Sequence, residues 1–124
     1  MKLSIVATLY QSATYIPEFY QRVSAAAKKL VGDDYEIILV NDGSPDNSLD
    51  IAVQLTESDY RLVVVDLSRN FGHHKAMMRG LSHAKGEQVF LIDSDLEEEP
   101  EWLLSFSSQM KMEQCDVVYG QQQQ

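Results

Sequence analysis

The sequence predicts an α/β fold with a mostly parallel sheet that is covered by helices on both faces. Short, continuous apolar runs alternate with helical patterns along the chain, and such runs are typical of strands buried on both faces. The 124 residues fit one domain, and the 44% apolar content is ample for a packed core. We expect this domain to span residues 1–120, followed by a short polar tail over 121–124.

The predicted elements follow one another in a regular order. The apolar runs predict strands over residues 1–9, 35–40, 61–67, 87–92 and 116–119. The helical patterns predict a helix that Pro17 opens and Gly32 ends, a helix capped by Asn47 or Ser48, and helices over about 74–84 and 100–112. No helix follows the last strand, so we expect the chain to be a fragment of a longer protein.

Charge and hydropathy exclude two classes of function. The formal net charge of −9 argues against nucleic acid as a partner, because binding to the phosphate backbone needs a basic face. No stretch approaches the ~20 consecutive apolar residues that a membrane-spanning helix needs. The excess of acids suits a cation site better.

Two acids stand directly after the strongest apolar run. Residues 89–92 are apolar, and Asp93, Ser94 and Asp95 follow them. Carboxylates outside the carboxyl end of a parallel strand suit a hard divalent cation that holds a phosphate. Loop and helix-cap chemistry is the alternative interpretation of an Asp-Ser-Asp turn. The helix expected from Pro100 explains some of the acids that follow, which leaves Asp93, Asp95 and Glu97 as candidate metal ligands.

Polar residues also follow the other strands. Because the carboxyl ends of parallel strands meet at one edge of a sheet, the loops after the first four strands become neighbours. These loops hold Thr8, Tyr10 and Ser12, then Asp42, Gly43 and Ser44, then Arg69, Asn70, Gly72, His73 and His74, and finally the acids. Such a set of residues can bind a nucleotide, with Asp42 accepting a hydrogen bond from a base or ribose. A plain turn is the alternative interpretation of Asp42 in its Asp-Gly-Ser-Pro context.

The motifs resemble the donor-binding half of the family 2 glycosyltransferases. The resemblance rests on residues 3–16, 36–44, 67–72 and 93–101, which keep the order of the family and span nearly the whole chain. Within the family, the Arg-Asn-Phe-Gly loop and the acidic Pro-Glu segment look most like the polyprenyl-phosphate sugar transferases, which include the dolichyl-phosphate mannose synthases. The resemblance implies a GT-A fold, a Rossmann-like sheet that binds a nucleotide-diphosphate sugar with Mg²⁺ or Mn²⁺.

Site residues are carried over from the resemblance by position. Asp42 would contact the base or ribose, Asp93 the nucleotide, and Asp95 the metal and the diphosphate. The implied nucleotide-binding residues are Thr8, Tyr10, Ser12, Asp42, Asp93, Ser94 and Asp95, and the implied metal ligands are Asp93, Asp95 and Glu97. Thr8 and Ser12 stand where the family commonly has Pro and Glu, so the base and the mode of ribose binding stay open.

The resemblance also implies a reaction. The expected activity is the transfer of a sugar from a UDP- or GDP-linked donor to a polyprenyl phosphate or a cell-surface glycan, with inversion and metal assistance. No catalytic base is assigned, because the acceptor side of the family lies beyond the donor half. We expect a cytoplasmic protein. A lipid-phosphate acceptor would suit a position at the cytoplasmic face of the membrane, with any membrane association made through parts absent from this chain. The alternative is a flavodoxin-like module that binds Mg²⁺ and a phosphoryl group without catalysis.

Overall fold

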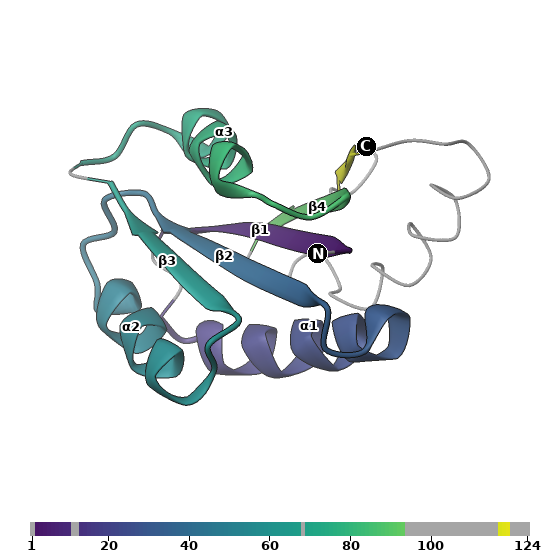
Figure 1. Cartoon of the computed structure of the whole chain (residues 1–124). Helices are drawn as coiled ribbons and strands as arrows, with labels where there is room; N and C mark the ends of the chain where they lie inside the picture. The colour runs from purple at the N-terminus through teal and green to yellow at the C-terminus, as the bar shows by residue number, and fades with distance from the viewer. Residues whose placement is uncertain (1, 11–12, 68, 94–116, 120–124) are drawn as a thin grey trace.

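A parallel sheet with helices on both faces organises the part of the chain that the computed structural model describes, residues 2–10, 13–67, 69–93 and 117–119 (Figure 1). The strands are β1 (Leu3–Leu9), β2 (Tyr35–Asn41), β3 (Leu62–Asp66), β4 (Gln88–Asp93) and β5 (Val117–Tyr119). Their order in the sheet is β3-β2-β1-β4-β5, and every neighbouring pair is parallel. The predicted α/β class is therefore confirmed.

Three helices connect the described strands. They are α1 (Ile16–Val31), α2 (Ser48–Ser58) and α3 (His73–His83). Each predicted strand and helix among the described residues is present, with ends that differ by a few residues at most. The helix predicted over 100–112 and the tail at 121–124 lie outside the described residues. Within the described part, none of the helices combines the length and the apolar content needed to cross a membrane.

The two faces of the sheet are covered by different helices. Figure 1 shows α1 and α2 on one side and α3 on the other. Because successive strand residues point to opposite faces, Ile5 and Ile37 pack with α1, whereas Val6 and Ile38 pack with α3. Both sets are fully buried, which explains why the strands read as unbroken apolar runs.

Helix α2 begins where predicted, with Asn47 at the N-cap position. The Asn47 side chain, however, makes no cap hydrogen bond. Asp46 supplies the acceptor instead: its Oδ1 receives the backbone N–H of Ser48 at 3.1 Å and the Ser48 hydroxyl at 2.5 Å. The carboxylate competes better for these donors than an amide oxygen because it is charged.

A buried carboxylate accepts hydrogen bonds near the amino ends of the first two strands. Glu36 in β2 is 5% exposed, and its Oε2 accepts from the Ser4 hydroxyl at 2.6 Å and from the Lys85 backbone N–H at 2.7 Å. The Ser4 hydroxyl oxygen in turn accepts from the Gly86 N–H at 2.8 Å. This network fixes the connection from α3 to β4 against the first two strands.

The close contact between α3 and the sheet gives a first prediction. A Cβ on Gly80 would lie 2.3 Å from Val6 Cγ1 and 2.8 Å from Val40 Cγ2. Alanine favours a helix over glycine, but the clash outweighs this preference, so we expect Gly80→Ala to lower the free energy of unfolding by about 1 kcal/mol. The control Ser82→Ala, on the exposed side of α3, should raise it by about 0.5 kcal/mol or less. Urea unfolding measures both, and a stabilised Gly80→Ala chain would contradict the packing argument.

Candidate functional site

The carboxyl ends of the strands place several predicted site residues side by side. In the sheet register, Thr8 of β1 stands next to Val40 of β2 on one side and next to Asp93 of β4 on the other. Asp42 comes directly after β2, and its N–H donates to the Leu9 carbonyl at 3.0 Å. The structure therefore brings the ends of β1, β2 and β4 to one edge, as predicted.

The predicted site residues divide into two groups by what the structure describes. Thr8 is 7% exposed within β1, and Tyr10, just after this strand, is 46% exposed. Ser12, Ser94, Asp95 and Glu97 lie outside the described residues. Of the predicted residues, Thr8, Tyr10, Asp42 and the backbone of Asp93 are thus placed, and their binding roles stay predictions.

Asp42 is buried where the loops after β2 and β3 meet. It is 2% exposed, and its Oδ1 accepts the backbone N–H of Phe71 at 2.8 Å. A buried carboxylate is costly unless hydrogen bonds compensate for the lost water, and the Phe71 N–H supplies one. A carboxylate has about four acceptor positions, so Asp42 can hold this loop and still accept from a ligand.

Gly43 allows the same two loops to touch. Its φ of 65° lies in the left-handed region, and a Cβ there would lie 2.3 Å from the Asn70 nitrogen and 2.5 Å from the Arg69 carbonyl carbon. The loop after β3 is also closed locally, because Asn70 Oδ1 accepts from the Gly72 N–H at 2.9 Å. The backbone between Arg69 and Gly72 is therefore held from both sides.

Asp46 ties the loop after β1 to the loop after β2. Its Oδ2 accepts the backbone N–H of Ala13 at 3.2 Å, while Oδ1 accepts from the Ser44 hydroxyl and from Ser48. Partial burial raises the pKa of Asp46, but the hydrogen bonds from Ser44 and Ser48 outweigh it and lower the pKa to about 2. No role was predicted for Asp46. The spacing Ser44, Asp46, Ser48 was the available signal, whereas the bond to Ala13 depends on tertiary contact.

The metal ligands are only partly within the described structure. Among the described residues, no group of three His, Cys, Asp or Glu side chains is placed to hold a metal ion. Asp95 and Glu97 lie outside those residues, and Asp93 ends β4. The predicted donor set consists of carboxylates alone, which fits the oxygen preference of Mg²⁺ and Mn²⁺.

A groove lies beside this edge. It has a volume of about 710 Å³ and runs between β3 and α3. Its lining includes Phe71 but none of Thr8, Tyr10 and Asp42. We therefore assign the candidate nucleotide site from the strand ends and loops, and treat the groove as a separate feature.

The fold and the site define a class of protein, an α/β domain with a ligand edge at the carboxyl ends of parallel strands. Comparison with known proteins agrees with this class. Residues 4–124 match the family described as "Glycosyl transferase family 2". The chain belongs to this family, which confirms the family-level resemblance seen in its motifs.

Two curated relatives cover almost the whole chain. It is 57% identical over 120 residues to "Putative glycosyltransferases" of Mycobacterium tuberculosis (strain CDC 1551 / Oshkosh), covering 97% of this chain and 35% of the relative. It is 37% identical over 120 residues to "Uncharacterized glycosyltransferase YkcC" of Bacillus subtilis (strain 168), covering 97% and 36%. The chain thus spans about a third of the length of these relatives.

Solved structures confirm the GT-A fold. The S. aureus TarS 1–349 complex with UDP-GlcNAc matches with a TM-score of 0.71 and 30% identity, over 90% of this chain and 32% of that one. The mannosyltransferase PcManGT from Pyrobaculum calidifontis, in complex with GDP-Man and Mn²⁺, matches with a TM-score of 0.68 and 23% identity, over 76% and 27%. The second likeness concerns the fold alone.

The lowered pKa of Asp46 gives a second prediction. The folded pKa of Asp46, about 2, lies below the ordinary value of 3.8. The ionised carboxylate therefore stabilises the folded chain at pH values above 3.8. This contribution is lost as the pH falls toward 2. We expect Asp46→Ala to be less stable than the parent chain at neutral pH, and the gap in the free energy of unfolding to narrow below about pH 4.

Urea unfolding at a series of pH values measures this gap. Glu57→Gln, which removes an exposed carboxylate of α2, is the matched control. A gap of the same size and pH dependence in both variants would contradict the role assigned to Asp46.

Proposed function

We propose that this chain forms the nucleotide-sugar-binding part of a glycosyltransferase. The observation that carries the proposal is the position of Asp42, buried where two loops meet, beside the ends of the strands that hold Thr8 and Asp93. Membership of family 2 supports a sugar donor over other nucleotides. The TarS structure at 30% identity holds UDP-GlcNAc, which supports a nucleotide sugar as the ligand class.

The nucleoside is proposed to lie over the loops after β1 and β2. Asp42 would accept from the base or ribose, with Thr8, Tyr10 and Ser12 around the nucleoside. The bonds from Phe71 to Asp42 and from Ala13 to Asp46 support this role, because they hold both loops in place before a ligand arrives. Such preorganisation lowers the ordering cost of binding.

The acids after β4 are proposed to hold a divalent cation. Asp93, Asp95 and Glu97 would be the ligands, with Ser94 near the nucleotide, and their oxygens suit Mg²⁺ or Mn²⁺. A bound cation supplies Lewis-acid stabilisation, worth several kcal/mol, to the negative charge that grows on a departing diphosphate. PcManGT, which shares the fold, is in complex with Mn²⁺.

The acceptor is proposed to be a polyprenyl phosphate, with a cell-surface glycan as the other candidate. The support is the resemblance of residues 67–72 and 93–101 to the polyprenyl-phosphate sugar transferases. An acceptor oxygen would displace the nucleotide in one step with inversion at the anomeric carbon. A phosphate oxygen is already ionised and needs no general base, whereas a hydroxyl would need one within hydrogen-bond reach.

A lipid-phosphate acceptor suits a position at the cytoplasmic face of a membrane, which we retain as part of the proposal. The flavodoxin-like module has no observation in its favour, because the family match extends over residues 4–124. Nucleic acid is not proposed as a partner, given the net charge of −9.

Calorimetric titration tests the donor site. We expect one of UDP and GDP to bind the chain in the presence of Mn²⁺ and to bind at least about tenfold more weakly without it. Asp95→Asn should lose this metal dependence because it removes one charged ligand. Asp50→Asn, which changes an exposed acid in the first turn of α2, is the control and should bind as the parent does. Failure of a folded chain to bind either nucleotide would contradict the proposal.

Asp42→Asn separates the two roles given to Asp42. The amide oxygen can still accept from the Phe71 N–H, so the fold should survive with a loss of about 1 kcal/mol or less. The amide nitrogen cannot accept from a ribose hydroxyl or a base N–H, so nucleotide affinity should fall by about tenfold or more. Thermal unfolding and calorimetry measure the two effects, and unchanged affinity in the folded variant would remove Asp42 from the site.

A further inference from the structure

The positive charges of this acidic chain are concentrated in residues 67–86. This stretch contains four of the ten Lys and Arg residues, Arg69, Lys75, Arg79 and Lys85, together with all three His residues. It contains none of the nineteen Asp and Glu residues. A chain with a net charge of −9 therefore carries one segment that is purely basic.

The structure places this segment on one side of the sheet. It forms the loop after β3, helix α3 and the connection to β4. Ala76 and Met77 are buried against β1 and β2, whereas Lys75, Arg79 and His83 recur every four residues on an exposed face of α3. Among the described residues, neither Lys75 nor Arg79 forms an ion pair with an acid.

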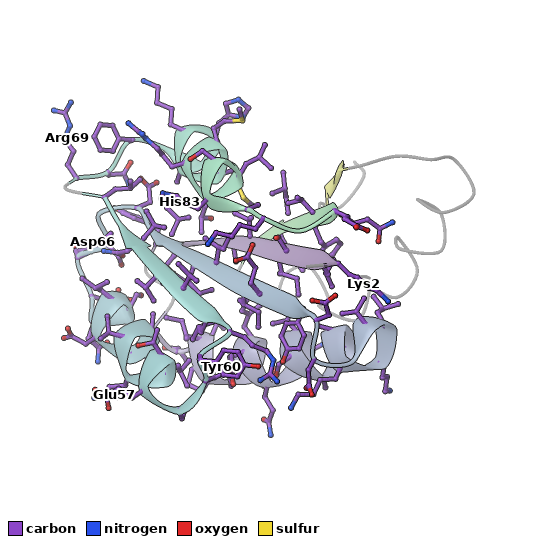
Figure 2. The ribbon with its side chains drawn as sticks, viewed as in Figure 1. Lys2, Glu57, Tyr60, Asp66, Arg69 and His83 are labelled. Atoms are coloured by element: carbon purple, nitrogen blue, oxygen red, sulfur yellow. The ribbon has the colours of Figure 1, made fainter. Side chains whose placement is uncertain are left out.

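Apolar side chains are exposed among these cations. Phe71 is 38% exposed and Met78 is 49% exposed. The Arg69 guanidinium lies over the Phe71 ring, 4.9 Å from its centroid. Figure 2 shows Arg69 at the outer end of the loop, directed away from the sheet. We call these residues the α3 surface: Arg69, Phe71, Lys75, Met78, Arg79 and His83.

The groove of about 710 Å³ runs along the α3 surface. Its floor includes Val65 of β3 and Leu67 just after this strand, and its wall on α3 includes Lys75 and Arg79. Among the described residues, Asp66 is the one acid in its lining, and its Oδ1 already accepts from Asn41 Nδ2 at 2.9 Å. The groove therefore joins an apolar floor to a basic rim.

We propose that the α3 surface docks on a bilayer that contains anionic phospholipid. Basic side chains interspersed with exposed apolar ones match the interface of such a bilayer, where phosphates attract the cations and the apolar groups enter the acyl boundary. Lys75 and Arg79 have long flexible side chains, which suit a fluid array of phosphates. An acidic protein partner has complementary charge as well, but it does not account for Phe71 and Met78 standing exposed between the cations.

Cosedimentation with vesicles tests the docking. The parent chain should bind vesicles of phosphatidylcholine with phosphatidylglycerol at least tenfold more tightly than vesicles of phosphatidylcholine alone, and high salt should weaken the binding. Lys75→Glu with Arg79→Glu should reduce binding to the anionic vesicles by tenfold or more. Met78→Ser should reduce the part of the binding that survives high salt.

A matched control separates the α3 surface from net charge. Lys28→Glu with Lys29→Glu makes the same change of formal charge on exposed positions of α1, which covers the opposite face of the sheet. It should leave vesicle binding within about twofold of the parent. Circular dichroism and thermal unfolding confirm that both double variants fold.

Three results would overturn the proposal. They are the absence of binding to anionic vesicles by the folded parent chain, an equal loss in the two double variants, and binding to polyglutamate without binding to vesicles. The last result would assign the α3 surface to an acidic protein. None of these measurements uses a nucleotide, so they succeed or fail independently of the donor-site proposal.

Discussion

The parallel pairing of β1 with both of its neighbours is the constraint on which the rest of the structure depends. β1 lies between β2 and β4, and its register sets Thr8 beside Val40 and Asp93. Parallel neighbours need a crossover, which the helices supply, so each strand enters from the same side and ends at the same edge. Thr8 and Asp93, which are separated by more than eighty positions, become neighbours through this register.

Carboxylates then fix the loops that leave this edge. Asp42 and Asp46 each accept a backbone N–H from another loop, from Phe71 and from Ala13. Glu36 does the same at the opposite end, where it accepts the Lys85 N–H. An acid that is already engaged with backbone donors has fewer lone pairs for a cation. Asp42 and Asp46 are therefore engaged in holding the loops, and Asp93, Asp95 and Glu97 stay the predicted ligands for a metal.

Sequence patterns predicted the sheet well because β1 and β2 are buried on both faces and the helices carry one apolar stripe. Ala76 and Met77 are buried residues of this stripe in α3. The pattern placed the start of α2 at Asn47 but missed that the Asp46 carboxylate accepts the hydrogen bonds from Ser48. It also missed the bond from Ala13 to Asp46, which joins residues 33 apart and exists only once two strands have paired. The residue pattern alone predicted Asp42 as a base or ribose contact and the acids after β4 as metal ligands, and the resemblance made the roles of the strand-end residues more specific.

Phe71 connects the two surfaces described for this chain. Its backbone N–H holds Asp42, at the edge assigned to the nucleotide, while its ring lies under Arg69 on the α3 surface. The two residues before it, Arg69 and Asn70, have their backbone close to Gly43, where a Cβ would clash with them. A movement of this loop at a lipid interface would therefore shift the Phe71 N–H that donates to the Asp42 carboxylate. If the proposed acceptor is a lipid phosphate, the same loop would set the donor edge close to the bilayer in which that acceptor resides.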